Sequence, residues 1–92
     1  MADLNIDNNA LASRFEALVN GGLAVLDYRI VGDTIFLLHV EVPAREQGRG
    51  IGSRLSKAAL EFSRDSGLKV VPRCPFVAAY LRRHPELLRS LS

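Results

Sequence analysis

The residues best suited to chemistry form a glycine-rich stretch near the middle of the chain. Positions 47–52 read Gln-Gly-Arg-Gly-Ile-Gly, between an apolar run and an amphipathic segment. Glycines leave the backbone uncovered, so several N–H groups can face one anion, and the start of a following helix adds positive potential. Arg45 and Arg49 could neutralise more of the charge. The stretch predicts a pyrophosphate-binding loop; the alternative is a flexible link into the helix that binds nothing.

Two common nucleotide-binding loops do not fit this stretch. A Walker loop requires Gly-Lys followed by Ser or Thr, and neither Gly-Lys-Ser nor Gly-Lys-Thr occurs in the chain. A dinucleotide fingerprint requires G-x-G-x-x-G; Gly48 and Gly50 fit its first two positions, but the third is Ser53. A nucleotide-binding domain is therefore the weaker interpretation.

Three alternating segments before the loop predict the strands that position it. They cover residues 14–19, 23–30 and 34–42, and the turn signals Asn20-Gly21-Gly22 and Val31-Gly32-Asp33 separate them. Segments this close in sequence pair as an antiparallel meander. Residues 1–12 are polar and aperiodic, so we expect a loosely ordered lead-in.

After the loop the apolar residues recur at helical spacing. This pattern predicts a helix that starts near Gly50, and Gly67 suits its C-terminal end. Residues 68–71 are typical of a short strand, Pro75 can begin a second helix, and 86–91 would add a last helical turn or two. The order β-β-β-α-β-α predicts one mixed α/β domain over residues 1–92, with a parallel fourth strand beside the third.

Composition excludes several other classes. The 92 residues suit one domain, and the net charge of +2 does not by itself imply nucleic acid. A single cysteine, Cys74, rules out an internal disulfide and a multi-cysteine metal site. The chain lacks a long uncharged apolar run and starts without a secretory signal, so we expect a cytoplasmic protein that does not enter a membrane.

A second group of ionisable residues lies on the third predicted strand. His39 and Glu41 are two positions apart, so a regular strand would place them on one face, roughly 6–7 Å apart, beside Ile35 and Leu37. Next to a reacting amine, one could take a proton directly and the other through water. The alternative is a polar sheet face on which His39 is only hydrogen-bonded.

The loop and several other stretches together resemble a known family. Gln47-x-x-Gly50-x-Gly52 is similar to the Q/R-x-x-G-x-G/A acetyl-CoA loop of the Gcn5-related N-acetyltransferases. Over most of residues 13–89 the chain resembles the short, single-domain, YjdJ-like subgroup of this family. The stretches that carry this resemblance are His39-Val40-Glu41-Val42-Pro43, Arg49-Gly50-Ile51-Gly52, Gly-Leu-Lys-Val-Val-Pro at 67–72, Cys74-Pro75-Phe76, Tyr80 and Arg83-His84-Pro85.

The resemblance implies acetyl-CoA as a co-substrate. Its pantetheine arm would lie in a cleft between two splayed strands, 34–42 and 68–72, and an amine acceptor would attack the thioester directly in a ternary complex. The coenzyme contacts implied by the resemblance and the loop are Val40, Val42, Arg45, Gln47, Gly48, Arg49, Gly50, Ile51, Gly52, Cys74 and Arg83.

Four residues are candidates for catalysis. His39 and Glu41 would act as bases, and Tyr80 corresponds to the family tyrosine that protonates the departing thiolate, although a tyrosine on a helix can also simply pack. Cys74 would lie near the thioester, either as a transient acyl acceptor or as a small residue that shapes the acyl pocket. The second role is preferred because direct transfer requires no cysteine.

The chain departs from full-length family members at its N-terminus. The strand-plus-helix pair that forms one wall of the acceptor site is missing or reduced to residues 1–12, so protein lysine, a polyamine and a small metabolite all stay open as acceptors. A non-catalytic acyl-CoA-binding or sensing module of the same fold is the alternative function. A domain with one thin wall could also pair with a second copy of itself.

Overall fold

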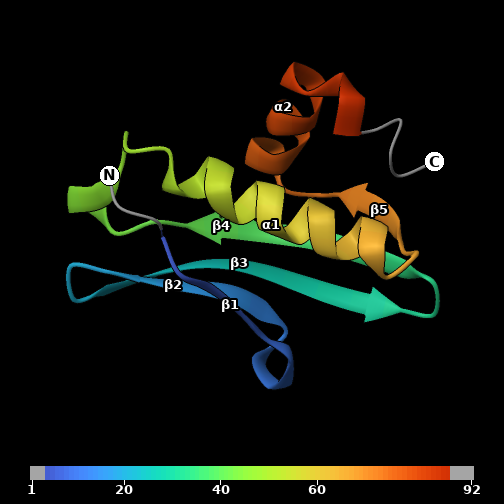
Figure 1. Cartoon of the computed structure of the whole chain (residues 1–92), viewed down its shortest axis with the longest axis horizontal. Helices are drawn as coiled ribbons and strands as arrows, with labels where there is room; N and C mark the ends of the chain where they lie inside the picture. Colours follow the sequence, from blue (N-terminus) through green and yellow to red (C-terminus); the bar gives the residue numbers. More distant parts are fainter. Residues whose placement is uncertain (1–3, 88–92) are drawn as a thin grey trace.

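The computed structural model describes residues 4–87 and contains one five-stranded sheet in which the strands follow in chain order (Figure 1). The first four strands pair antiparallel, and the last pairs parallel with its neighbour. The strands are β1 (Ile6–Asn9), β2 (Arg14–Val19), β3 (Gly22–Val31), β4 (Thr34–Glu41) and β5 (Lys69–Pro72). The mixed α/β sheet, with its meander and its one parallel pair, is confirmed.

The N-terminal segment differs from the expectation of a loose lead-in. Residues 6–9 form β1, which pairs with β2 from Ile6 opposite Ala17 to Asn9 opposite Arg14. A 3-10 helix, η1 (Ala10–Ala12), then joins the two strands. The prediction of a loosely ordered lead-in was therefore wrong for the described part of this segment. Residues 1–3 lie outside the described residues.

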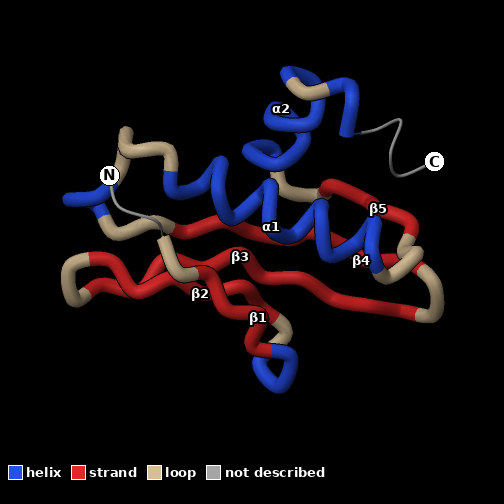
Figure 2. The backbone as a smooth tube through the Cα atoms, in the orientation of Figure 1, coloured by secondary structure: helices blue, strands red, loops and turns tan. Residues whose placement is uncertain are grey.

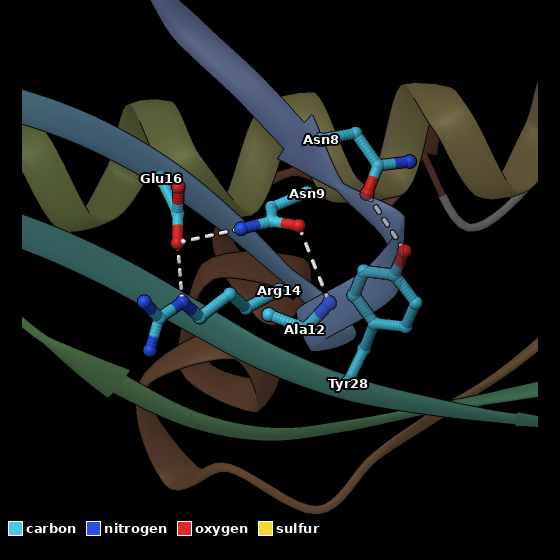
Figure 3. A network of polar contacts seen from close by, with 6 residues as sticks. All are labelled: Asn8, Asn9, Ala12, Arg14, Glu16 and Tyr28. Carbon is cyan, nitrogen blue, oxygen red and sulfur yellow. Dashed lines mark hydrogen bonds and ion pairs between the residues drawn. The ribbon is translucent and has the colours of Figure 1, made fainter.

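The polarity that argued against a strand in this segment supplies its hydrogen bonds (Figure 3). Tyr28 Oη donates to Asn8 Oδ1 at 2.7 Å, and Asn9 Nδ2 donates to Glu16 Oε2 at 3.2 Å. Asn9 Oδ1 also accepts from the backbone N–H of Ala12 at 3.2 Å and so caps η1. Polar side chains of β1 thus bond to residues of β2 and β3, in a segment that lacks the apolar alternation a strand usually shows.

Two helices complete the fold: α1 (Ile51–Asp65) and α2 (Pro75–Arg83). Figure 2 shows α1 running along the sheet and α2 standing at its β5 side. The predicted ends are confirmed: Gly67 follows the C-cap of α1 with a φ of 69°, and Pro75 occupies the first turn of α2. Residues 85–87 are helical, as expected for the start of 86–91, and the rest of that segment lies outside the described residues.

The core forms between one face of the sheet and the two helices. Its fully buried side chains include Leu26, Leu37, Leu55 and Val77, each at most 2% exposed. The other face stays open, since Leu18 and its cross-strand partner Leu23 are 72% and 43% exposed. We call the face that packs against the helices the inner face, and the face that carries Leu18 and Leu23 the outer face.

A bulge divides β4. Asp27 lies opposite His39, whereas the next residue of β3, Tyr28, lies opposite Leu37, so Leu38 is an extra residue on β4. Because strand side chains alternate, one extra residue moves every following side chain to the other face. His39 and Glu41 therefore share the outer face with their partners Asp27 and Val25, and both are exposed. The prediction that they lie beside Ile35 and Leu37 was wrong.

Candidate functional site

The site lies where β4 and β5 stop pairing. The two strands run together from Thr34 opposite Lys69 to Leu37 opposite Pro72. One more bond follows, from Cys74 N to Leu37 O at 2.9 Å. Beyond it β4 continues to Glu41 while the chain after β5 turns into α2. The second half of β4 thus has an edge toward α2 that β5 does not cover.

A cavity of about 470 Å³ adjoins this uncovered edge. The bulge turns Val40, which lies opposite Leu26, toward the inner face and so into the cavity wall. The residues that line the cavity are Val40, Val42, Glu46, Gln47, Gly48, Gly50, Ile51, Gly52, Ser53, Phe76 and Arg83. The end of β4, the glycine loop and one side of α2 therefore meet at one place.

Residues of the glycine loop line this cavity. Gly48 and Gly50 have φ values of 85° and 78°, which place both in the left-handed region that favours glycine. The first turn of α1 closes with Arg54 N donating to Gly50 O at 3.1 Å. Within residues 4–87, no group accepts from the backbone N–H groups of residues 50–53, which form the N-cap and first turn of α1. Free amides at a helix N-terminus form an anion-binding arrangement.

Gln47 serves the loop in a different way from the glycines. Its backbone N–H donates to Ala44 O at 3.4 Å, within the 3-10 helix η2 (Ala44–Glu46). Its side-chain Nε2 donates to Val42 O at 3.2 Å. Both the backbone and the side chain of Gln47 are therefore engaged, and this residue ties the loop to the end of β4.

Gly52 contributes through close packing and not through a left-handed backbone angle. It lies in the first turn of α1, and a Cβ added there would come 2.8 Å from Cζ of Phe76. A side chain at position 52 would require the ring of Phe76 to shift, because this ring packs closely on the first turn of α1. This close approach brings α2 to the cavity and makes Phe76 part of its wall.

The three arginines assigned to the coenzyme lie in different surroundings. Arg83 lines the cavity. Arg49 is bound by Glu46, with 3.0 Å between Nη1 and Oε1, and Arg45 is exposed on η2. Of these, Arg83 is the cation that the fold places in the cavity wall.

The catalytic candidates surround the site without forming its wall. His39 and Glu41 project from the outer face, while Tyr80 and Cys74 are 7% and 5% exposed. Cys74 caps α2 and is a free thiol. The described residues that line the cavity do not include any of these four.

Tyr80 occupies an environment that favours its neutral form. Phe76, Tyr80 and Arg83 follow one another at helical spacing, and the ring of Tyr80 lies 4.3 Å from that of His84. Burial, followed by the carboxylates of Glu86 and Glu61, raises the pKa of the Tyr80 phenol above its ordinary value. The phenol therefore keeps its proton through the neutral range.

Three wall residues were not identified from the sequence: Glu46, Ser53 and Phe76. Ser53 follows the glycine loop directly, and Phe76 follows Pro75 at the start of the second predicted helix. Their positions next to recognised features could have identified both as site residues. Glu46 gave no such signal, because a carboxylate beside an anion site is unexpected.

The fold agrees with what similar proteins show. Residues 14–91 match the sequence profile of the family described as GCN5-related N-acetyl-transferase. The chain belongs to this family.

Individual proteins similar to this chain come from animals and from a bacterium. Human protein NATD1 is 35% identical over 85 residues, which are 89% of this chain and 75% of that protein. Protein NATD1 of Xenopus tropicalis is 33% identical over 87 residues, 91% and 80% of the two chains. A GCN5-like putative N-acetyltransferase of Staphylococcus aureus solved by NMR superposes with a TM-score of 0.69 at 27% identity, covering 96% of this chain and 87% of its own.

The described residues contain neither a membrane-spanning helix nor a cluster of metal ligands. None of their helices is long and apolar enough to cross a membrane. Over the same residues, no three His, Cys, Asp or Glu side chains come together in a way that could hold a metal ion.

Proposed function

We propose that this chain is an N-acetyltransferase that moves an acetyl group from acetyl-CoA to an amine. The observation that carries the proposal is the set of unpaired N–H groups of residues 50–53, at the N-terminus of α1 and beside the cavity. Membership of the GCN5-related family supports acetyl-CoA as the ligand. Within that family, we assign the chain to the short, single-domain, YjdJ-like subgroup.

In this proposal the coenzyme pyrophosphate binds the amides of residues 48–53. Arg83, which shares the cavity wall, contributes positive charge. The pantetheine arm follows Val40 and Val42 along the part of β4 that β5 leaves uncovered. Cys74, bound to Leu37 O where the two strands stop pairing, marks the acetyl end and shapes the acyl pocket.

The acceptor amine approaches the gap between β4 and β5 from the outer face. His39 and Glu41 lie on that face just beyond the bulge, where they can take a proton from the attacking nitrogen. The nitrogen forms a bond to the thioester carbonyl, the C–S bond breaks, and the thiolate takes a proton from Tyr80. The raised pKa of Tyr80 keeps that proton available at neutral pH.

A second candidate function rests on the same cavity. The side chains assigned to catalysis are absent from the described cavity wall, which favours a module that binds acyl-CoA without turning it over. Such a module would retain the loop and the anion site but would need neither His39 nor Tyr80.

One experiment separates the two functions. Calorimetry of the purified chain with coenzyme A tests the site, and release of free thiol from acetyl-CoA in the presence of a panel of amines tests turnover. The enzyme proposal expects binding and amine-dependent release of thiol. Binding without release for any amine would support the module, and no binding would refute both.

A further inference from the structure

Glu46 is a buried carboxylate in the wall of a cavity that we assign to anionic phosphates. The residue is 7% exposed and follows Pro43 by three positions, at the end of η2. Burial of an ionised carboxylate is costly unless it is hydrogen-bonded or paired. A carboxylate beside bound phosphates would repel them, so we expect Glu46 to have a structural role whose benefit exceeds this repulsion.

The partners of Glu46 indicate that role. Its Oε1 accepts from Asn20 Nδ2 at 2.8 Å and from Arg49 Nη1 at 3.0 Å. Asn20 lies in the turn between β2 and β3, with a φ of 50°, while Arg49 lies within the glycine loop itself. One carboxylate oxygen thus connects the loop to a turn whose Asn20 lies 26 residues before Glu46.

The same turn touches the loop segment at a second point. A Cβ added to Gly22, the first residue of β3 after the turn, would lie 2.8 Å from Cγ of Pro43, so this end of the turn packs closely on the residue two positions after β4. The β2–β3 turn therefore holds both ends of the segment 43–46. Since that segment leads directly into the glycine loop, the turn fixes where the loop begins.

We propose that Glu46 is a positioning residue that fixes the glycine loop to the β2–β3 turn before the coenzyme binds. This inference rests on the proposed placement of the pyrophosphate. Gly48 and Gly50 give the loop its left-handed angles but leave it with many accessible conformations when it is free. Groups fixed in the bound arrangement in advance bind more tightly, because less conformational entropy is lost on association.

Electrostatics and positioning predict opposite effects of removing Glu46. If the carboxylate acted only as a negative charge, Glu46→Ala would bind coenzyme A more tightly. If Glu46 holds the loop, Glu46→Ala binds coenzyme A about tenfold more weakly, because the freed loop must lose conformational entropy when the coenzyme binds. Glu46→Gln is the matched control, since an amide oxygen accepts from both partners, and it should bind at least as well as the unsubstituted chain.

The Asn20 side of the contact offers an independent test. Asn20→Gly tolerates the positive φ but removes the amide, so it should weaken binding in the same direction as Glu46→Ala. Asn20→Asp places two carboxylates together and should weaken binding further. The double variant Asn20→Asp with Glu46→Gln restores a donor and an acceptor with their positions exchanged, and it should recover the affinity.

Amide hydrogen exchange of the ligand-free chain measures the loop without coenzyme. We expect Glu46→Ala and Asn20→Gly to speed exchange at residues 48–50, while exchange in α1 beyond its first turn stays unchanged. Calorimetric titration of each folded variant with coenzyme A completes the test. Unaltered exchange together with unaltered or tighter binding in Glu46→Ala would overturn the proposal. If the unsubstituted chain does not bind coenzyme A, the proposed function fails, and the exchange data alone decide whether Glu46 holds the loop.

Discussion

The two halves of β4 belong to one strand but do different things. Thr34 to Leu37 pair with β3 on one side and β5 on the other, and Ile35 and Leu37 are fully buried. The half after Leu38 pairs with β3 alone and has one side in the cavity wall and the other exposed. One strand thus supplies both the centre of the sheet and the edge of the site.

The bulge at Leu38 is what separates these halves. It lies next to Leu37, the last residue of β4 that pairs with β5, so the change of face and the loss of pairing coincide. Bulges occur often beside functional sites because they redirect side chains without interrupting the strand. We therefore expect the first half to respond to substitution through stability and the second through binding or turnover.

The largest expected effect is on stability and uses adjacent leucines. Leu37 is fully buried, so Leu37→Ala should lower the free energy of unfolding by about 2–5 kcal/mol. Leu38 is 44% exposed, so Leu38→Ala should cost only about 0.5 kcal/mol. Urea unfolding followed by circular dichroism gives both values. Equal losses for the two variants would contradict the division of the strand at the bulge.

The next effect is on coenzyme binding at the loop that follows the second half. A Cβ added at Gly50 would meet no other atom within 4 Å, and aspartate tolerates a left-handed backbone better than most residues. Gly50→Asp should therefore fold, but it places a carboxylate among the phosphate-facing amides. Affinity for coenzyme A should fall at least about 100-fold because like charges would be brought together with little water between them.

Gly50→Asn is the control for this change. Asparagine has the same shape as aspartate, tolerates the same backbone angles and carries no charge. It should retain much more of the affinity measured by calorimetry than Gly50→Asp. A pair of variants that bind equally well would remove the phosphates from this part of the loop.

A smaller effect concerns turnover on the outer face. His39→Ala should lower turnover roughly 10²-fold, the usual contribution of a general base, while coenzyme affinity and stability stay nearly constant. The histidine is exposed, so its removal leaves no cavity. Steady-state rates with an acceptor amine, compared between His39→Ala and Glu41→Ala, show which residue is the base. Full activity in both variants would exclude a base on this face.

The smallest effect is the response of Tyr80 to alkaline pH. Because the pKa of Tyr80 is raised on folding, the folded chain holds this proton more tightly than the unfolded chain. The associated stability is complete below the ordinary tyrosine pKa of about 10 and is lost as pH rises through the folded value. Tyr80→Phe should flatten this decline in urea unfolding above the ordinary tyrosine pKa. An identical decline in Tyr80→Phe would assign it to another group.

Local signals in the sequence were enough to place the elements that depend on single residues. The turn at Asn20 and Gly21, the start of α1 after Gly50, its end before Gly67 and the start of α2 at Pro75 all follow from backbone preferences of single residues. The glycine loop was found for the same reason, because the spacing of its glycines is visible without any partner. These features need only neighbouring residues to be in place.

The faces of β4 and the long-range polar contacts depend on the folded chain. From Ile35 to Leu38 every residue is apolar, so both faces of the strand fit the pattern and an inserted residue leaves no trace in the sequence. Pairing with β3 fixes the register, and one extra residue reverses the side to which His39 and Glu41 point. The strand β1 and the hydrogen bond from Asn20 to Glu46 could not be predicted from the sequence either. Each depends on a polar partner that only folding brings near.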